Sequence, residues 1–167
     1  MTRAGTLLRA CAVLALCGTA ALGQGVDLAF GGIAHDSSQP VEITADSLSV
    51  DQTAQTAIFE GNVVVGQGTL RLGAARIDVR YSAESSTGQI ERLEASGTVT
   101  LTNGAEAAEA TRAVYTVADG SVVMEGDVLL TQGQNAISGE RLRIDLDAGR
   151  AVMEGRVRTI FQPGTTE

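Results

Sequence analysis

Few side chains in this sequence could carry out covalent or acid–base chemistry. The single histidine, His35, lies in a Gly- and Ser-rich stretch without catalytic partners nearby in sequence, so we expect a solvated tail residue. Both cysteines, Cys11 and Cys17, fall in the first 23 residues, which are typical of a removable leader. The mature chain would then have neither disulfide nor thiol chemistry, and it shows no nucleophile motif. We therefore predict no enzyme, no catalytic residue and no cofactor.

Acidic side chains beside a recurring glycine are the other candidates for chemistry. Glu60, Glu125, Asp127 and Glu154 each lie next to such a glycine, and paired carboxylates could hold a metal or hydrolyse a glycoside. They alternate with apolar positions, which predicts an outward face where charge keeps a sheet hydrated. No known ligand spacing is present, so no metal is predicted, and a calcium site shared between stacked repeats stays an alternative.

The N-terminus predicts export. A short start with two arginines precedes an apolar run over 10–16, and the small residues Ala21 and Gly23 occupy the cleavage-site positions. The run is too short for a transmembrane span, and an uncleaved anchor is the alternative. Lipidation of Cys17 is a further alternative, but Leu16 directly before it is larger than lipidation favours. Beyond residue 23 the chain has 10 arginines and 20 acidic residues, a net charge of −10, which argues against nucleic-acid binding.

A four-fold repeat organises the rest of the chain. It is marked by Gly61, Gly97, Gly126 and Gly155, at intervals of 36, 29 and 29 residues. Apolar residues lie at every second position around each glycine, with polar residues between them, so each segment is predicted to be a strand with one apolar face.

A second strand precedes each glycine-containing strand and shows a shift of parity. The apolar residues in the first part of this strand lie an odd number of positions from those in its second part. A bulge or corner is therefore expected near Ala45, Ala74, Ala110 and Gly139. Hairpins with one apolar face are stable only when they stack. The predicted fold is all-β, an antiparallel folded-over sheet or β-jelly roll over 41–161. A signal peptide (1–23) and a flexible lead-in (24–40) would precede it, and a tail (162–167) would follow.

Several segments, in this order after a leader, resemble the OstA-like domain of the periplasmic lipopolysaccharide-transport bridge family, the LptA family. The segments are Gln39–Ile43, Ala45–Asp46, Phe59–Val65, Gln67–Leu70 and Ile137–Leu142. The resemblance implies a V-shaped sheet whose apolar interior holds acyl chains and whose edge strands pair with neighbouring proteins. It also implies a periplasmic bridge between inner- and outer-membrane transport complexes, in contact with lipopolysaccharide and with possible head-to-tail self-association.

The resemblance assigns two sets of residues. The expected lipid-binding groove comprises Val41, Ile43, Phe59, Val63, Val99, Leu101, Tyr115, Val117, Met124, Val128 and Met153. The expected edge-strand contacts are Val41, Ile43, Val157, Ile160 and Phe161. Because a hydroxyl on an inward face suits a groove mouth, Tyr115 is expected near that mouth. Alternation alone favours an ordinary sandwich core, because a period of two reports burial and not what is buried, and it is the resemblance that favours lipid contact.

Three functions therefore compete. The first is lipid transfer, and the second is a structural β-scaffold that pairs with transport partners without binding lipid. The third, a sugar binder or hydrolase, is disfavoured by the absence of Trp and by only five Phe and Tyr residues. For an anionic headgroup the candidate cations are Arg71, Arg76, Arg112 and Arg141, with divalent ions as a further means of contact.

Overall fold

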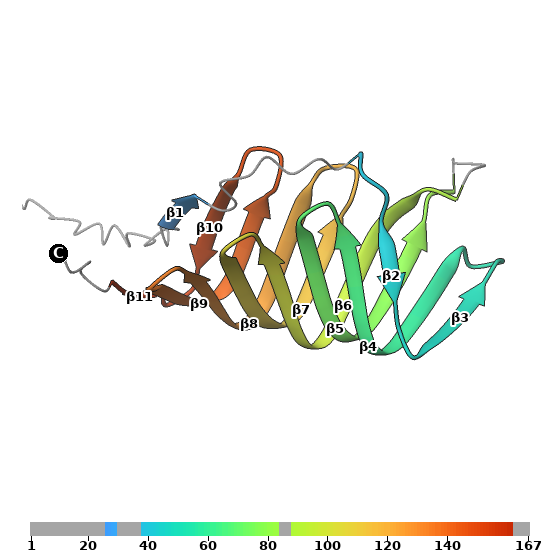
Figure 1. Ribbon diagram of the computed structural model, residues 1–167, viewed down its shortest axis with the longest axis horizontal. Helices are drawn as coiled ribbons and strands as arrows, with labels where there is room; N and C mark the ends of the chain where they lie inside the picture. The colour runs from blue at the N-terminus through green and yellow to red at the C-terminus, as the bar shows by residue number, and fades with distance from the viewer. Residues whose placement is uncertain (1–25, 30–37, 84–87, 162–167) are drawn as a thin grey trace, which may run out of the picture.

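A computed structural model describes residues 26–29, 38–83 and 88–161, and all strands in this part of the chain belong to one antiparallel sheet (Figure 1). The short strands are β1 (Val26–Ala29), β2 (Glu42–Thr44), β3 (Ser47–Asp51), β10 (Arg150–Glu154) and β11 (Arg158–Ile160). The long strands are β4 (Thr56–Gln67), β5 (Leu70–Tyr81), β6 (Ile90–Asn103), β7 (Glu106–Thr116), β8 (Ser121–Gln132) and β9 (Asn135–Asp145).

The sheet follows the chain as a meander, with the order β1-β10-β9-β8-β7-β6-β5-β4-β2. At one end β2 and β3 both pair with β4, and at the other β1 pairs with β10 while β11 pairs with β9. From β3 to β10 consecutive strands are neighbours, because turns join them directly as antiparallel hairpins. The two ends of the sheet are therefore formed by short strands.

The repeat glycines mark bends in the sheet, three of them within β4, β6 and β8 and the fourth, Gly155, directly after β10. The four φ angles lie between +76° and +85°, a region that only glycine adopts readily, and the residue after each glycine also has a positive φ. Pairing shifts at these points, for example between Glu60 and Val63 in β4 and between Gly73 and Arg76 in β5. The corners expected near Ala74 and Ala110 are thus confirmed as β-bulge positions.

The bends fold the sheet into two walls, visible as two layers joined along the lower edge in Figure 1. We define the first wall as β1, β3, β10, the halves of β4, β6 and β8 before the bend, and the halves of β5, β7 and β9 after it. The second wall contains β2, β11 and the remaining halves. The all-β, antiparallel prediction is confirmed.

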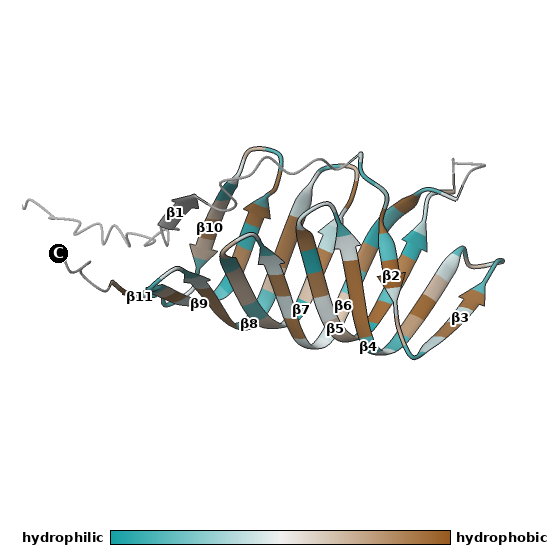
Figure 2. Ribbon diagram, viewed as in Figure 1, coloured by the Kyte–Doolittle hydropathy of each residue, from teal (hydrophilic) through white to brown (hydrophobic). Residues whose placement is uncertain are grey.

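The core lies between the walls. Hydrophobicity alternates along the long strands, seen as bands in Figure 2, and the inward positions form one buried cluster. Ile77, Leu93, Leu130 and Leu142 are among its fully buried members. Aliphatic side chains dominate it, because Phe and Tyr together number five in the whole sequence.

The N-terminal segment differs from expectation in one respect. Strand β1 falls within the stretch 24–40 that the sequence predicts to be a flexible lead-in, and it pairs with β10 from Val26 opposite Met153 to Ala29 opposite Arg150. The expected signal peptide, His35, both cysteines and the tail 162–167 lie outside the described residues. Within the described ranges, no helix has the length and apolar character needed to cross a bilayer.

Candidate lipid groove and its mouth

The structure gathers the expected groove residues on one apolar interior. Those buried in the core cluster are Val63, Val99, Leu101, Tyr115, Met124, Val128 and Met153. Those half-buried and packed against it are Val41, Ile43, Phe59 and Val117. The first set comes from β4, β6, β7, β8 and β10, so the interior extends along most of the sheet.

Tyr115 lies deeper than expected for a residue at a groove mouth. Its side chain is 1 % exposed, and its hydroxyl donates a hydrogen bond to Oε1 of Gln67 at 2.6 Å. Gln67 is 2 % exposed, and its Nε2 donates to the backbone oxygen of Gln39 at 2.9 Å. Burial raises the pKa of Tyr115 to about 12, and the charge of Asp147 adds to the shift. The hydroxyl therefore stays protonated at neutral pH and can act as a donor.

These bonds join three parts of the molecule. Tyr115 belongs to the first wall, Gln67 ends β4 in the second wall, and Gln39 precedes β2. Gln67 was not among the residues expected at the site. The available signal was its inward parity, two residues after Val65, which is unusual for an amide in a strand with an apolar face.

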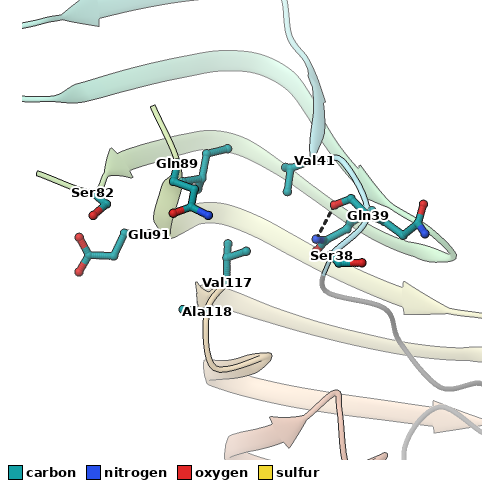
Figure 3. Close-up of a pocket in the computed structure, with 10 residues that line it drawn as sticks. Ser38, Gln39, Val41, Ser82, Gln89, Glu91, Val117 and Ala118 are labelled. Carbon is teal, nitrogen blue, oxygen red and sulfur yellow. Dashed lines mark hydrogen bonds between the residues drawn. The ribbon is translucent and has the colours of Figure 1, made fainter. Parts of the chain in front are cut away.

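A pocket of about 620 Å³ opens beside this hydrogen-bonded chain (Figure 3). Its lining comprises Ser38, Gln39, Val41, Gln67, Ser82, Gln89, Ile90, Glu91, Val117 and Ala118. The apolar members Ile90 and Val117 belong to the first wall and its turns, whereas Gln67 belongs to the second. The pocket is therefore a mouth between the two walls, and it includes Val41 and Val117 of the expected groove.

Three of the repeated acids, Glu60, Glu125 and Glu154, pair with arginines on the outer face near the bends. Arg76 donates to Glu60 and Asp78, each at 2.7 Å, and these two carboxylates raise its pKa. Arg141 and Arg112 both bind Glu125 and lower the pKa of that carboxyl.

The contacts of the arginines show where the candidate cations for an anionic headgroup lie. Arg76, Arg112 and Arg141 are held on the outside of the bends and do not line the mouth. Arg71 donates to the backbone oxygens of Gly68 and Leu70, at 2.6 and 2.8 Å. Within the described ranges, no group of three or more His, Cys, Asp or Glu residues is arranged to hold a metal.

Exposed apolar side chains gather at the two ends of the sheet. Leu48 and Val50 of β3 are exposed at one end, Val50 by 58 %. Ile160 and Phe161 are exposed at the other, Phe161 by 72 %. Of the other expected edge contacts, Ile43 lies in β2 and Val41 just before it, while Val157 is half-buried ahead of β11.

Comparison with known proteins gives a consistent result. Residues 42–150 match the family described as "LptA/(LptD N-terminal domain) LPS transport protein". That match covers well over half of the chain. The chain belongs to this family of lipopolysaccharide transport proteins. The family is described by transport and not by an enzymatic reaction, in agreement with the prediction that this chain is not an enzyme.

Individual relatives agree with this membership of the LptA/LptD N-terminal-domain family. An uncharacterized protein of Rhizobium meliloti, R00383, is 33% identical over 132 residues, which are 72% of this chain and 71% of that protein. The lipopolysaccharide export system protein LptH of Pseudomonas aeruginosa is 33% identical over 79 residues, 47% of this chain and 42% of its own. The export protein LptA of Haemophilus influenzae is 36% identical over 63 residues, 38% of this chain and 36% of its own. The matches span less than half the length of these named export proteins.

A solved structure shares the fold. The crystal structure of LptH from Pseudomonas aeruginosa, described as the periplasmic component of a lipopolysaccharide transport device, superposes with a TM-score of 0.68. The match covers 77% of this chain and 99% of that chain at 20% sequence identity. At this identity the likeness concerns the fold, and it supports the folded-over β-jelly roll.

Proposed function

We propose that this chain is a periplasmic lipopolysaccharide-binding transport protein that holds acyl chains between its two walls. In this proposal it bridges inner- and outer-membrane transport complexes by pairing its end strands with them, or with further copies of itself. Membership of the lipopolysaccharide transport family supports lipopolysaccharide as the cargo. The shared fold with LptH, which is described as a periplasmic component, supports a periplasmic location. The signal peptide expected over 1–23 would provide export.

The observation that carries the proposal is the apolar interior, which extends along the long strands and reaches the surface at the mouth beside Val41, Ile90 and Val117. Each acyl methylene transferred from water into such an interior contributes about 0.8 kcal/mol. The contact is non-directional, because an aliphatic wall imposes little register on a chain moving along it. Firm binding and sliding are therefore compatible.

The ends of the sheet support the bridging step. Strands β2 and β11 are only three residues long, and the exposed Val50 and Phe161 lie at edges that pair with no further strand among the described residues. An edge strand with free backbone groups is a template for β-augmentation by another chain. Pairing at both ends would extend the sheet and join the interiors of neighbouring proteins.

The test is photocrosslinking to lipopolysaccharide in the periplasm of producing cells. A photoreactive residue would replace Val117 at the mouth or Leu101 in the interior, and the exposed Asp127 provides the outward control. Tyr115 is a less suitable probe site because its hydroxyl is hydrogen-bonded to Gln67. We expect lipopolysaccharide adducts at Val117 and Leu101 and none at Asp127.

The second candidate function is a structural scaffold that pairs with transport partners and binds no lipid. The close packing of the interior favours it. Leu101, Met124 and Met153 are each at most 1 % exposed, so acyl chains could bind only after the walls separate. Exported, folded protein that pairs with its partners but yields no adduct at either probe site would establish the scaffold and refute lipid binding.

A further inference from the structure

The inward positions along the open edges of the two walls, at the mouth and beyond it, differ in chemistry. The inward positions at the rim of the first wall carry side chains packed against the core or buried in it, namely Tyr81, Ile90, Val117 and Leu146. Ser82, Gln89 and Glu91 lie next to them along the mouth. The inward positions at the rim of the second wall carry Gln67, Asn103, Glu106, Gln132 and Asn135, which we call the amide row. An apolar and a polar rim facing one interior suit a ligand that is itself amphipathic.

The amide row extends across six strands, β4 to β9, with Leu70 of β5 as its one apolar interruption. The register places Gln67 opposite Leu70, Leu70 opposite Asn103, Asn103 opposite Glu106, Glu106 opposite Gln132, and Gln132 opposite Asn135. With neighbouring strands about 4.8 Å apart, five such steps span about 24 Å. The row therefore runs perpendicular to the strands, along the length of the interior.

The repeat itself places the amides in this row. Gln67, Asn103 and Gln132 each lie six residues after a repeat glycine and one before the glycine that begins the next turn. The fourth repeat has Phe161 at that position, at the end of the sheet. A carboxamide thus occupies the same inward place in three successive units, where an aliphatic residue would bury more apolar surface.

Members of the row are hydrogen-bonded to one another or to neighbouring side chains in the present conformation. Thr69 donates to Oδ1 of Asn103 at 2.8 Å, and Gln132 donates through Nε2 to Glu106 at 2.8 Å. Gln67 and Asn103 are 2 % and 4 % exposed, whereas Glu106, Gln132 and Asn135 are half-buried. A ligand hydroxyl could replace one of these contacts at the half-buried end at little net cost, because one hydrogen bond is exchanged for another.

We propose that the amide row binds the sugar side of the glycolipid, at its junction with the acyl chains, through neutral hydroxyl and amide groups rather than phosphate. This inference rests on the proposed function. The row contains four carboxamides and one carboxylate and no cation, and Glu106 would repel a phosphate. The nearest arginine in register, Arg71 beside Leu70, lies on the outward face and donates to backbone oxygens. Polar side chains on five of the six strands would let a headgroup move stepwise while its acyl chains slide below.

The test compares two probes on the exported chain. One probe is purified lipopolysaccharide, and the other is a fluorescent C16 fatty acid that has acyl character but no sugar. The variant is Q132L/N135L, at the half-buried end of the row. The matched control is T131L, which adds the same side chain one residue away on the outward face of β8. Thermal unfolding verifies that each variant is folded.

We expect Q132L/N135L to weaken lipopolysaccharide binding about tenfold, the loss of one to two net hydrogen bonds, with fatty-acid binding unchanged. T131L should change neither. The same loss should appear with dephosphorylated lipopolysaccharide. Equal weakening for both probes, no weakening for lipopolysaccharide, or a loss that disappears on dephosphorylation would each overturn the assignment. Wild-type protein that binds neither probe would refute the proposed function itself, and the row with it.

Discussion

The hydroxyl of Tyr115 donates a 2.6 Å hydrogen bond to the side-chain oxygen of Gln67 and so connects the two walls of the folded sheet through the interior. The two residues are 48 positions apart in sequence and belong to different repeats. Both side chains are almost fully buried beneath the mouth. A polar contact in a mainly aliphatic core fixes the position of the walls relative to each other, because dispersion contacts alone tolerate small displacements.

Removing this hydroxyl should destabilise the protein. Y115F deletes the donor to Gln67 in a buried setting, and we expect the free energy of unfolding to fall by about 1–2 kcal/mol. Urea denaturation followed by circular dichroism measures the change. The control is Y81F, at a half-buried tyrosine of the same sheet. Equal destabilisation by both substitutions would contradict a specific contribution from the bond between the walls.

The same tyrosine should make stability dependent on alkaline pH. Burial raises the pKa of Tyr115 to about 12, above its value of about 10 in the unfolded chain. Its contribution is therefore fully present below pH 10 and is lost as the pH rises to about 12, because the unfolded state releases the proton first. Two pKa units correspond to an upper limit of about 2.7 kcal/mol.

Unfolding free energies measured between pH 9 and 12 for wild type and Y115F isolate this contribution. The difference between the two proteins should shrink across that interval. A constant difference would show that the pKa of Tyr115 is the same in the folded and unfolded states.

Glycine at the bends should be far more sensitive to substitution than glycine at the turns. At Gly126, φ is +85° and an added Cβ would clash with Oγ1 of Thr111, which donates to the backbone oxygen of Glu125. At Gly133, φ is +59° and an added Cβ would meet no atom within 4 Å. We expect G126A to cost about 3 kcal/mol and G133A about 1 kcal/mol.

Thermal or urea unfolding of the two variants tests this difference. Adding T111A to G126A should recover part of the loss by removing the clash, while the backbone strain remains. If G126A were no more destabilising than G133A, the bend would not depend on the conformational freedom of glycine.

Much of the fold could be predicted because its determinants are local. The parity shift around Gly139, with Ile137 on one side and Leu142 on the other, reports a corner that the structure forms. The pairing of β1 with β10 could not be predicted in the same way. Its partner strand lies more than 120 residues away in sequence, and four residues carry too little pattern to specify a strand.

The groove could be predicted as an apolar face but not as a site with two different rims. The burial of Tyr115 depends on the distance between the walls, which no alternation of residues encodes. The amides Gln67, Asn103 and Gln132 were visible in the repeat, but only the register shows that they form one row with Glu106.

Head-to-tail pairing, part of the proposed function, predicts a complementation between variants of the two ends. V50D places a charge at the exposed apolar end formed by β3, and F161D places one at the opposite end. Each variant alone should remain monomeric at concentrations where the wild type self-associates, because every contact needs one end of each kind.

A mixture of the two variants should behave differently from either alone. The intact end of the V50D chain, beside Phe161, can pair with the intact end of the F161D chain, beside Val50, so the mixture should form dimers and nothing larger. Analytical ultracentrifugation distinguishes these species, and D127N, at an exposed outward position, is the control that should behave as wild type. If either variant dimerised alone, the interface would join like ends, and the head-to-tail arrangement would be wrong.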